Sequence, residues 1–438
     1  MRRATVLLSA CVAVAAVAGA VSGAGAAPRP ARTTFASYAA PPGMGDDAGE
    51  PTLGVHPKTG AVLFQSAQNV LRVTGFDGRG GATWTDVTPL LPGLYTFDPI
   101  LETDVGTGRT FTSQLDLYCS RMAYTDDAGR NWTQVPLGCS PGATFDHQSV
   151  GVGKLIGGDP DAYPNAVYYC AQTGVTAMCG VSTDGGDTFG PAVPAFSIND
   201  CTTSHGHLKS GPDGTTYLPS WACGDRAGLA RTTDNGKSWQ VRTVPGSTVG
   251  DAMHPSVGVG SDGTVYFAWG GRLPGQAGGP PYASVSRDRA GTWTKPVRLG
   301  AEHGIVNTRF VTTVAGDGDR AAVAYLGSKT GGDGSDAAFM GTWRQYVSFT
   351  YDRGRHWTTV EATPPVQAGT ICTSGALCGA DRNLLDFNDL VIDGRGRVLA
   401  AFADGCPGAV CTRATRLAKA TIARQESGRG LLRRYDGR

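Results

Sequence analysis

The chain has 438 residues, with 38 lysines and arginines against 37 aspartates and glutamates. This near-neutral balance argues against a nucleic-acid or anionic-membrane partner, either of which would need a strong basic excess. The 64 glycines and 26 prolines are typical of a protein built from many short strands and turns.

The N-terminus predicts a secretion signal over residues 1–26. A basic start (Arg2, Arg3) is followed by an apolar stretch (4–21) and by a small-residue cleavage site that ends at Ala26. Nothing later in the sequence is long and apolar enough to cross a membrane. We therefore expect a secreted, extracellular protein that acts as a monomer.

An eight-residue pattern, S/T-x-D-x-G-x-T/S-W/F, recurs along most of the chain. Close copies end at Trp132, Phe189, Trp239 and Trp357, and looser copies end at Trp84 and Trp293. The aromatic residues recur about every 50 to 60 positions, which suits one four-stranded propeller blade with its loops. In each copy the aspartate is expected to accept hydrogen bonds within a tight turn. These structural aspartates are Asp127, Asp184, Asp234, Asp288 and Asp352.

The pattern is that of the Asp-box, and the chain resembles the sialidase-like, Asp-box (bacterial neuraminidase repeat) β-propellers. The resemblance covers residues 46–424. It implies an all-β fold, a single β-propeller of four-stranded blades with Asp-box turns between strands 3 and 4. Seven blades are predicted, with six as the alternative. The Pro/Ala-rich lead-in (27–45) is a candidate outer strand that closes the ring, and 425–438 are predicted to be a basic disordered tail.

Ten cysteines remain after the predicted signal, and an even number in a secreted chain predicts disulfides. We expect neighbours to pair, as Cys119–Cys139, Cys170–Cys179, Cys201–Cys223, Cys372–Cys378 and Cys406–Cys411. All ten map to the face of the disc that also carries the long loops. Function collects on loops that a rigid scaffold positions, so this face should hold the site.

The residues that open the inner strands should converge on the channel mouth of this face. The candidate catalytic residues among them are Asp98, Asp146, His147, His205, His207, His254, Asp386 and Asp389. The candidate substrate-binding residues on the same ring are Glu50, Asn307, Arg309 and Arg382. Such groups would act as acid and base on a bound ligand, or would bind a divalent cation. Acid–base action on a ligand would require no cofactor. Alternatively, these residues are a generic polar lining of the channel and have no catalytic or binding role.

Three tryptophans lie outside the repeated pattern, namely Trp221, Trp269 and Trp343. They are predicted at the ends of second strands on the loop-rich face, where they would stack on sugar rings. Packing in the core at a blade edge is the alternative. With Arg309 and Arg382, Arg320 is an arginine placed to hold a carboxylate or sulfate.

The resemblance implies, for the sialidases themselves, three arginines, a tyrosine nucleophile activated by a glutamate, and an aspartic acid. The first arginine position is occupied by Glu50 and the second falls within 66–69, neither of which supplies an arginine. Tyr282 and Tyr346 are candidates for the nucleophile by location only. We predict a secreted sialidase-like propeller that acts on an extracellular glycan or glycoprotein, as an exo-sialidase or another glycoside hydrolase. A polysaccharide lyase, a non-catalytic glycan- or protein-binding propeller and a structural envelope protein are the alternatives.

Overall fold

The computed structural model describes residues 1, 32–91, 98–116, 119–135, 137, 146–158, 162–250, 254–276, 278–408 and 410–436. The predicted signal (1–26) and Cys139 lie outside the described residues. No helix in the described part of the chain is long and apolar enough to span a membrane.

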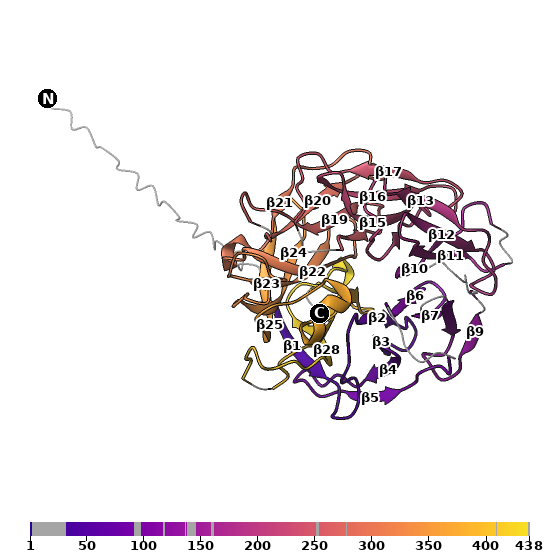
Figure 1. Cartoon of the computed structure of the whole chain (residues 1–438). Helices are drawn as coiled ribbons and strands as arrows, with labels where there is room; N and C mark the ends of the chain where they lie inside the picture. Colours follow the sequence, from indigo (N-terminus) through magenta and orange to yellow (C-terminus); the bar gives the residue numbers. More distant parts are fainter. Residues whose placement is uncertain are drawn as a thin grey trace.

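Seven antiparallel sheets of four strands surround a central channel (Figure 1). Blades 1 and 2 consist of β2 (Thr52–Val55), β3 (Val62–Ser66), β4 (Asn69–Thr74) and β5 (Thr83–Asp86), then β6 (Ile100–Thr103), β7 (Thr110–Asp116), β8 (Cys119–Thr125) and β9 (Thr133–Val135). Blades 3 and 4 consist of β10 (Asp146–Lys154), β11 (Asn165–Gln172), β12 (Thr176–Ser182) and β13 (Val193–Ser197), then β14 (Lys209–Ser210), β15 (Thr216–Cys223), β16 (Arg226–Thr232) and β17 (Gln240–Thr243). The fold class predicted from the repeat is confirmed, with seven blades rather than six.

The remaining blades complete the ring. Blade 5 consists of β18 (Ser256–Val259), β19 (Val265–Gly270), β20 (Pro281–Ser286) and β21 (Val297–Arg298), and blade 6 of β22 (Asn307–Ala315), β23 (Ala321–Ser328), β24 (Thr342–Thr350) and β25 (Thr358–Ala368). Blade 7 combines β26 (Asp389–Ile392), β27 (Val398–Asp404) and β28 (Lys419–Ser427) with β1 (Thr34–Ala39). Three short 3₁₀ helices are η1 (Ala301–His303), η2 (Gly375–Arg382) and η3 (Arg433–Tyr435).

The two ends of the described chain meet in blade 7. Strand β1 pairs antiparallel with β28, from Thr34 opposite Ser427 to Ala39 opposite Thr421. The side-chain oxygens of Thr34 and Ser427 are 2.6 Å apart. The lead-in therefore supplies the outer strand that closes the ring.

The second strands of two blades are buried along their whole length, which requires a neighbouring blade on each side. Every residue of β19 (VYFAWG) and of β23 (AAVAYLGS) is buried. A strand packed on one face only would alternate buried and exposed residues, whereas these strands are covered by neighbouring blades on both faces. The core is therefore shared between adjacent blades rather than contained within each one.

The repeated turns between the third and fourth strands have one geometry. In blade 3, Asp184 Oδ1 accepts hydrogen bonds from Ser182 Oγ (2.6 Å) and Thr188 N (3.0 Å). Its Oδ2 accepts a bond from the Thr188 hydroxyl (2.5 Å), and Gly186 N donates to Ser182 Oγ (2.8 Å). Equivalent bonds surround the predicted aspartates of the other turns, Asp127, Asp234, Asp288 and Asp352. The carboxylate thus holds the turn.

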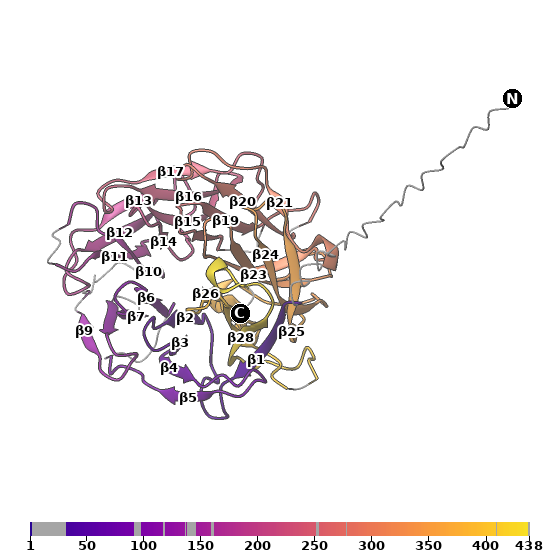
Figure 2. The same cartoon turned by 180° about the vertical axis from the view of Figure 1, so that it is seen from behind.

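The C-terminal segment corrects a prediction, because 425–436 are ordered. Strand β28 extends to Ser427, Leu431 is fully buried and η3 follows. Arg320 donates two hydrogen bonds to the carboxylate of Asp436 (2.8 and 2.5 Å). The basic composition of this segment predicted a disordered, solvated tail. Instead, acidic and basic residues of the β22–β23 turn form hydrogen bonds and ion pairs with it. In both views the yellow C-terminal segment lies near the centre of the ring (Figure 2).

Four predicted disulfides are present, Cys170–Cys179, Cys201–Cys223, Cys372–Cys378 and Cys406–Cys411. Cys119 is also disulfide-bonded. Disulfides persist in oxidising environments outside the cytosol, so this number of bridges fits an extracellular protein.

Candidate functional site

Three carboxyl side chains meet where neighbouring inner strands begin. Glu50 precedes β2, Asp98 precedes β6 and Asp146 opens β10. Both of the other carboxyl groups influence the pKa of Asp98, and Asp98 Oδ2 accepts a hydrogen bond from the backbone N of His147 (2.7 Å). Glu50 and Asp98 are buried, at 2% and 8% exposure, whereas the side chain of Asp146 is 48% exposed. We call these three residues the carboxyl cluster, and Asp146 is the member that solvent reaches most easily.

The cluster holds protons unequally. Burial and the negative charge of Asp386 raise the pKa of Glu50 to about 8. Burial and Glu50 also raise the pKa of Asp98 well above its usual value. Burial alone would raise the pKa of Asp146, but the hydrogen bond from Asp98 and the neighbouring His147 outweigh it and lower that pKa. Asp146 therefore gives up its proton more readily than Glu50 and Asp98 do.

The backbone at this mouth is strained in one repeated way. Glu50, Asp98, His147 and His254 have φ angles of 55°, 83°, 48° and 56°. Residues with a Cβ atom rarely adopt this left-handed region, and such strain concentrates at binding and catalytic sites. Four equivalent outliers in different blades indicate that the mouth requires this conformation to aim its side chains inward.

Histidines surround one aromatic ring at the same mouth. His254 and His207 stack on Phe387, with ring centroids 4.1 and 4.6 Å apart. His147 lies 4.6 Å from His254, centroid to centroid. The structure thus brings together the histidines that the sequence placed on neighbouring blades, around a phenylalanine that sequence reasoning missed.

Burial disfavours the charged form of three of the mouth histidines. Burial lowers the pKa of His205 and of His207 to about 3, and it lowers that of His254 well below its usual value. Nε2 of His205 and both ring nitrogens of His254 have no hydrogen-bond partner. Buried nitrogens without partners are costly, so the histidine group keeps unused bonding capacity at the mouth.

Arg382, at the end of η2, brings a positive charge to the mouth. Its guanidinium donates two hydrogen bonds to Asp386 (3.0 and 2.8 Å). The arginine side chain remains 24% exposed, while that of Asp386 is 5% exposed. Asp386 is therefore already neutralised, and Arg382 is the member of the pair that a ligand could reach.

Asp389 was predicted as catalytic, but its carboxylate joins the inner strands of two neighbouring blades. Its Oδ2 accepts a hydrogen bond from the backbone N of Leu53 in the next blade (2.9 Å). Thr52 makes the equivalent contact with Leu101 N (2.8 Å), and Ser149 makes it with Leu208 N (2.8 Å). Asp389 thus belongs to a belt of side chains that join inner strands.

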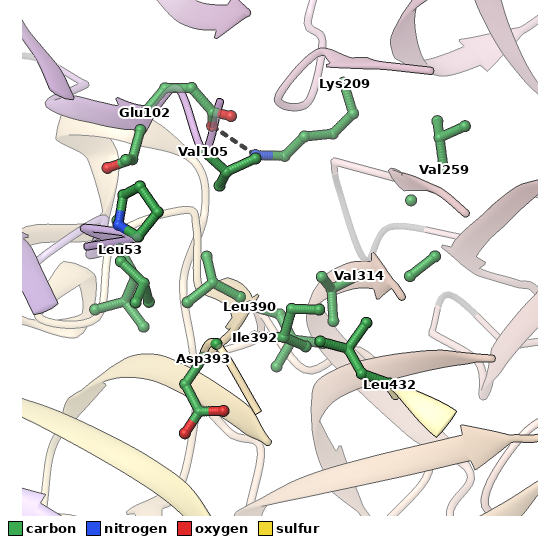
Figure 3. A pocket seen from close by; sticks show the side chains of 18 of the residues that line it. Leu53, Glu102, Val105, Lys209, Val259, Val314, Leu390, Ile392, Asp393 and Leu432 are labelled. Carbon is green, nitrogen blue, oxygen red and sulfur yellow. Dashed lines mark hydrogen bonds and ion pairs between the residues drawn. The ribbon is translucent and has the colours of Figure 1, made fainter. Parts of the chain in front are cut away.

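The inner strands also line a cavity of about 590 Å³. Aliphatic side chains such as Leu53, Leu390 and Leu432 line it, and an ion pair lies along one side of it (Figure 3). Lys209 Nζ lies 2.6 Å from Glu102 Oε2. Sequence reasoning missed this pair, although Lys209 follows His207 by two positions and strand side chains two apart share a face.

Several predicted ligand-binding residues are committed to internal contacts instead. Trp269 and Trp343 are 1% and 0% exposed and donate their indole N–H groups to backbone carbonyls, so they are core residues. Arg309 is fully buried and donates to Thr308 O and to Ser335 Oγ. These burials exclude the proposed stacking and carboxylate-holding roles in this conformation.

The other outlying candidates are explained in the same way. Asn307 donates to Gly332 O (2.9 Å) and so fixes a loop. Arg320 binds the C-terminal segment, away from the mouth. The hydroxyl of Tyr346 lies 3.4 Å from Glu361, and Tyr282 packs against Trp269. Of the predicted tryptophans, only Trp221 is partly exposed.

The expected divalent-cation site gains no support. Within the described ranges, no group of three or more His, Cys, Asp or Glu side chains is arranged to hold a metal ion. The carboxyl cluster keeps its negative charge low by retaining protons, and the histidines stack on Phe387.

No protein-family model matches the sequence, and no curated protein is similar to it. Solved structures do match. The fold is shared with glycan-active propellers. An ulvan lyase of polysaccharide lyase family PL25, bound to -[GlcA(1-4)Rha3S]-, is 10% identical with a TM-score of 0.51, and the match covers 91% of this chain and 97% of that one.

Two further structures extend the comparison. The GH74 enzyme of Niastella koreensis is 17% identical with a TM-score of 0.52, and the match covers 85% of this chain and 53% of that one. This chain therefore spans about half the length of that enzyme. A Hadza microbial sialidase is 12% identical with a TM-score of 0.42, over 83% and 73% of the two chains. At these identities the likeness concerns the fold alone.

Proposed function

We propose that this protein is an extracellular enzyme that acts on a glycan at the channel mouth, with Asp146 as the reacting carboxylate. One observation carries the proposal: Asp146 is half exposed and has a lowered pKa, and it stands beside the buried Asp98, whose pKa is raised well above its usual value. Neighbouring acids whose environments separate their pKa values are the usual arrangement for acid–base catalysis. The glycan-active propellers that share the fold support a carbohydrate substrate.

The placement of the carboxyl groups favours elimination over hydrolysis. Two-carboxylate hydrolysis needs two groups that flank the bond that is cleaved. Asp98 and Asp146 stand together in the carboxyl cluster, and each shifts the pKa of the other. They would act as one acid–base unit on one side of the substrate, which suits a polysaccharide lyase.

In this reaction Asp146 takes the proton from C5 of a uronate sugar. The C4–O bond breaks as the C4–C5 double bond forms, and a proton from the Asp98–Asp146 pair passes to the departing sugar oxygen. Arg382 is the partly exposed cation of the mouth and would balance the uronate carboxylate. His147, with Nε2 3.6 Å from Asp146 Oδ2, would hold Asp146 in its ionised form.

Hydrolysis, the first expectation from the sequence, is the second candidate. The separated pKa values of Asp98 and Asp146 favour it, because a glycosidase also needs one protonated and one ionised acid. It requires Asp98 and Asp146 to move apart around the substrate. A sialidase mechanism has less support, because it needs three arginines. Among the described residues, Arg382 is the arginine whose charge acts on Glu50 of the carboxyl cluster.

Product chemistry tests the proposal. Purified protein is incubated with uronate-rich, neutral and sialylated glycans, and unsaturated uronate (by ultraviolet absorbance) and new reducing ends are measured together. We expect both signals on a uronate-rich glycan, with Asp146→Asn slower by at least about 100-fold. Asp336→Asn is the matched control, because that exposed carboxylate contacts only the backbone of Ala338.

The possible outcomes separate the two reactions. New reducing ends without unsaturated product would establish hydrolysis and overturn elimination. Binding without any product would overturn both reactions and leave a glycan-binding propeller. An Asp146→Asn variant as fast as the control would show that Asp146 is not the reacting carboxylate.

A further inference from the structure

We infer that a second cavity, beside the mouth and floored by Trp221, is a subsite for an acidic sugar unit of the glycan. This inference rests on the proposed function, because it assigns a place for the chain that extends from the reacting residue. The cavity has a volume of about 520 Å³ and is lined by residues that include Thr202, Trp221, Asp225, Thr248 and Arg272. Its size lies within the usual range of ligand sites.

The indole of Trp221 is fixed before any ligand arrives. Its Nε1 donates to Gly250 O (3.1 Å), and the buried Trp269 donates to Thr248 O (3.1 Å) in the same crossing. Two indole N–H groups therefore hold the same short segment. An aromatic ring with its polar edge bonded and its face partly exposed can stack on a sugar at little entropic cost.

Covalent and backbone contacts also brace the cavity. The Cys201–Cys223 disulfide joins its two walls. Beside it, Thr202 N donates to Ala222 O (2.7 Å). These contacts make the floor a rigid part of blade 4, as a binding subsite requires.

The cavity adjoins the segment that carries a histidine of the mouth. The backbone N of Trp221 donates to Ser204 O (3.1 Å), one residue before His205. His205 itself forms a β-bridge with Ser220. Trp221 and a histidine of the mouth therefore lie on adjacent, hydrogen-bonded segments, which places the cavity next to the mouth.

The charges of the cavity select the class of sugar. Arg272 is exposed, and within the described residues its side chain forms no ion pair or hydrogen bond. Its guanidinium offers the planar pair of donors that matches a carboxylate or a sulfate. Asp225, with a side chain 92% exposed, lies 3.8 Å from Arg226 and can accept bonds from sugar hydroxyls. The cavity thus fits a uronate or a sulfated sugar better than a neutral one.

Calorimetric binding tests the subsite with two probes, hexameric oligogalacturonate and neutral cellohexaose. We expect the wild type to prefer the acidic probe and Trp221→Ala to weaken it about tenfold. Trp221→Phe, which keeps an aromatic face, should stay within about threefold of the wild type. Arg272→Gln should reduce the preference for the acidic probe, while Arg395→Gln, an exposed control elsewhere, should not.

Turnover adds a readout that a structural role would not move. With a polymeric substrate, Trp221→Ala should raise KM and leave kcat near the wild-type value, because Trp221 lies outside the carboxyl cluster and would bind the glycan without taking part in the reaction. Equal binding by the wild type and Trp221→Ala, or wild-type failure to bind either probe, overturns the subsite. If the product screen is still positive, the proposed function survives that result. A negative product screen removes the proposed function, and the inference with it.

Discussion

Acidic side chains occur both in the repeated turns and in the carboxyl cluster, but their pKa values shift in opposite directions. In the blade 3 turn, hydrogen bonds from Ser182 and Thr188 outweigh the effect of burial and lower the pKa of Asp184 to about 2. At the mouth, burial and neighbouring acids raise the pKa of Glu50 to about 8. An aspartate that receives donors is a fixed structural anion, whereas an acid surrounded by other acids keeps a proton that can be moved.

This contrast also separates the sequence signals. The turn aspartates recur with a fixed pattern because each one solves the same local problem. The mouth acids recur only as positions before inner strands, and their protonation depends on contacts between blades that are distant in the sequence. The repeated turn pattern therefore marks the scaffold here, whereas the candidate site depends on contacts between blades.

The largest expected effect is on stability. Asp184→Ala should lower the free energy of unfolding by about 1–3 kcal/mol, because Thr188 N and two hydroxyl groups lose their acceptor. Asp146→Asn should change it little, since Asp146 is half exposed. Denaturant unfolding measures both, with Thr183→Ala as the exposed control in the same turn. Equal losses for Asp184→Ala and Asp146→Asn would remove the distinction between the two regions.

The second prediction concerns pH. The pKa of Glu50 is raised in the folded state from 4.5 to about 8, so its contribution to stability is full below pH 4.5 and is lost as pH rises toward 8. Between about pH 7 and 8, wild-type stability should fall with a slope of at most about 1.4 kcal/mol per pH unit. Glu50→Gln should flatten this slope.

This pH range avoids the titration of the buried histidines, and the comparison with Glu50→Gln isolates the contribution of Glu50. Below this range the buried histidines act in the opposite direction, because the pKa of His205 is lowered from 6.5 to about 3 in the folded protein. Unfolding measured at several pH values in the same buffer series gives the slope. Identical slopes for the wild type and Glu50→Gln would mean that Glu50 is ionised in the folded state.

The smallest effect is expected at the C-terminal segment. Arg320→Ala should destabilise the protein by about 1 kcal/mol, because the ion pair with the partly exposed Asp436 is lost. A double-mutant cycle with Asp436→Asn measures the pair itself. Limited proteolysis should then cut the segment near Arg429 first. An unchanged cleavage pattern would show that the pair does not hold the segment.

Much of the fold could be predicted because it depends on local chemistry. The spacing of the closing aromatics predicted four-stranded propeller blades, and the lead-in was recognised as the candidate outer strand. The prediction for the C-terminal segment was wrong because a basic stretch looks solvated until its partners are known. Those partners, Asp317 and Asp319, lie in a turn more than a hundred residues earlier.

The site was harder to predict, for a related reason. Histidines and acids could be placed at the mouth from their positions before inner strands, but their protonation depends on the contacts between blades. Trp269 and Trp343 looked exposed because each ends a second strand or lies beyond one. Their burial comes from packing that no single blade reveals. Trp221 has a similar position in the chain, but its side chain is only partly buried.

Closure of the ring in blade 7 has a consequence for how the protein is made. The contact between Thr34 and Ser427 joins positions 393 residues apart. Strand β1 therefore leaves the ribosome early and has no partner until β28 has been synthesised. A chain shortened before that point would retain an open seam with unpaired strand edges, which invite association between copies.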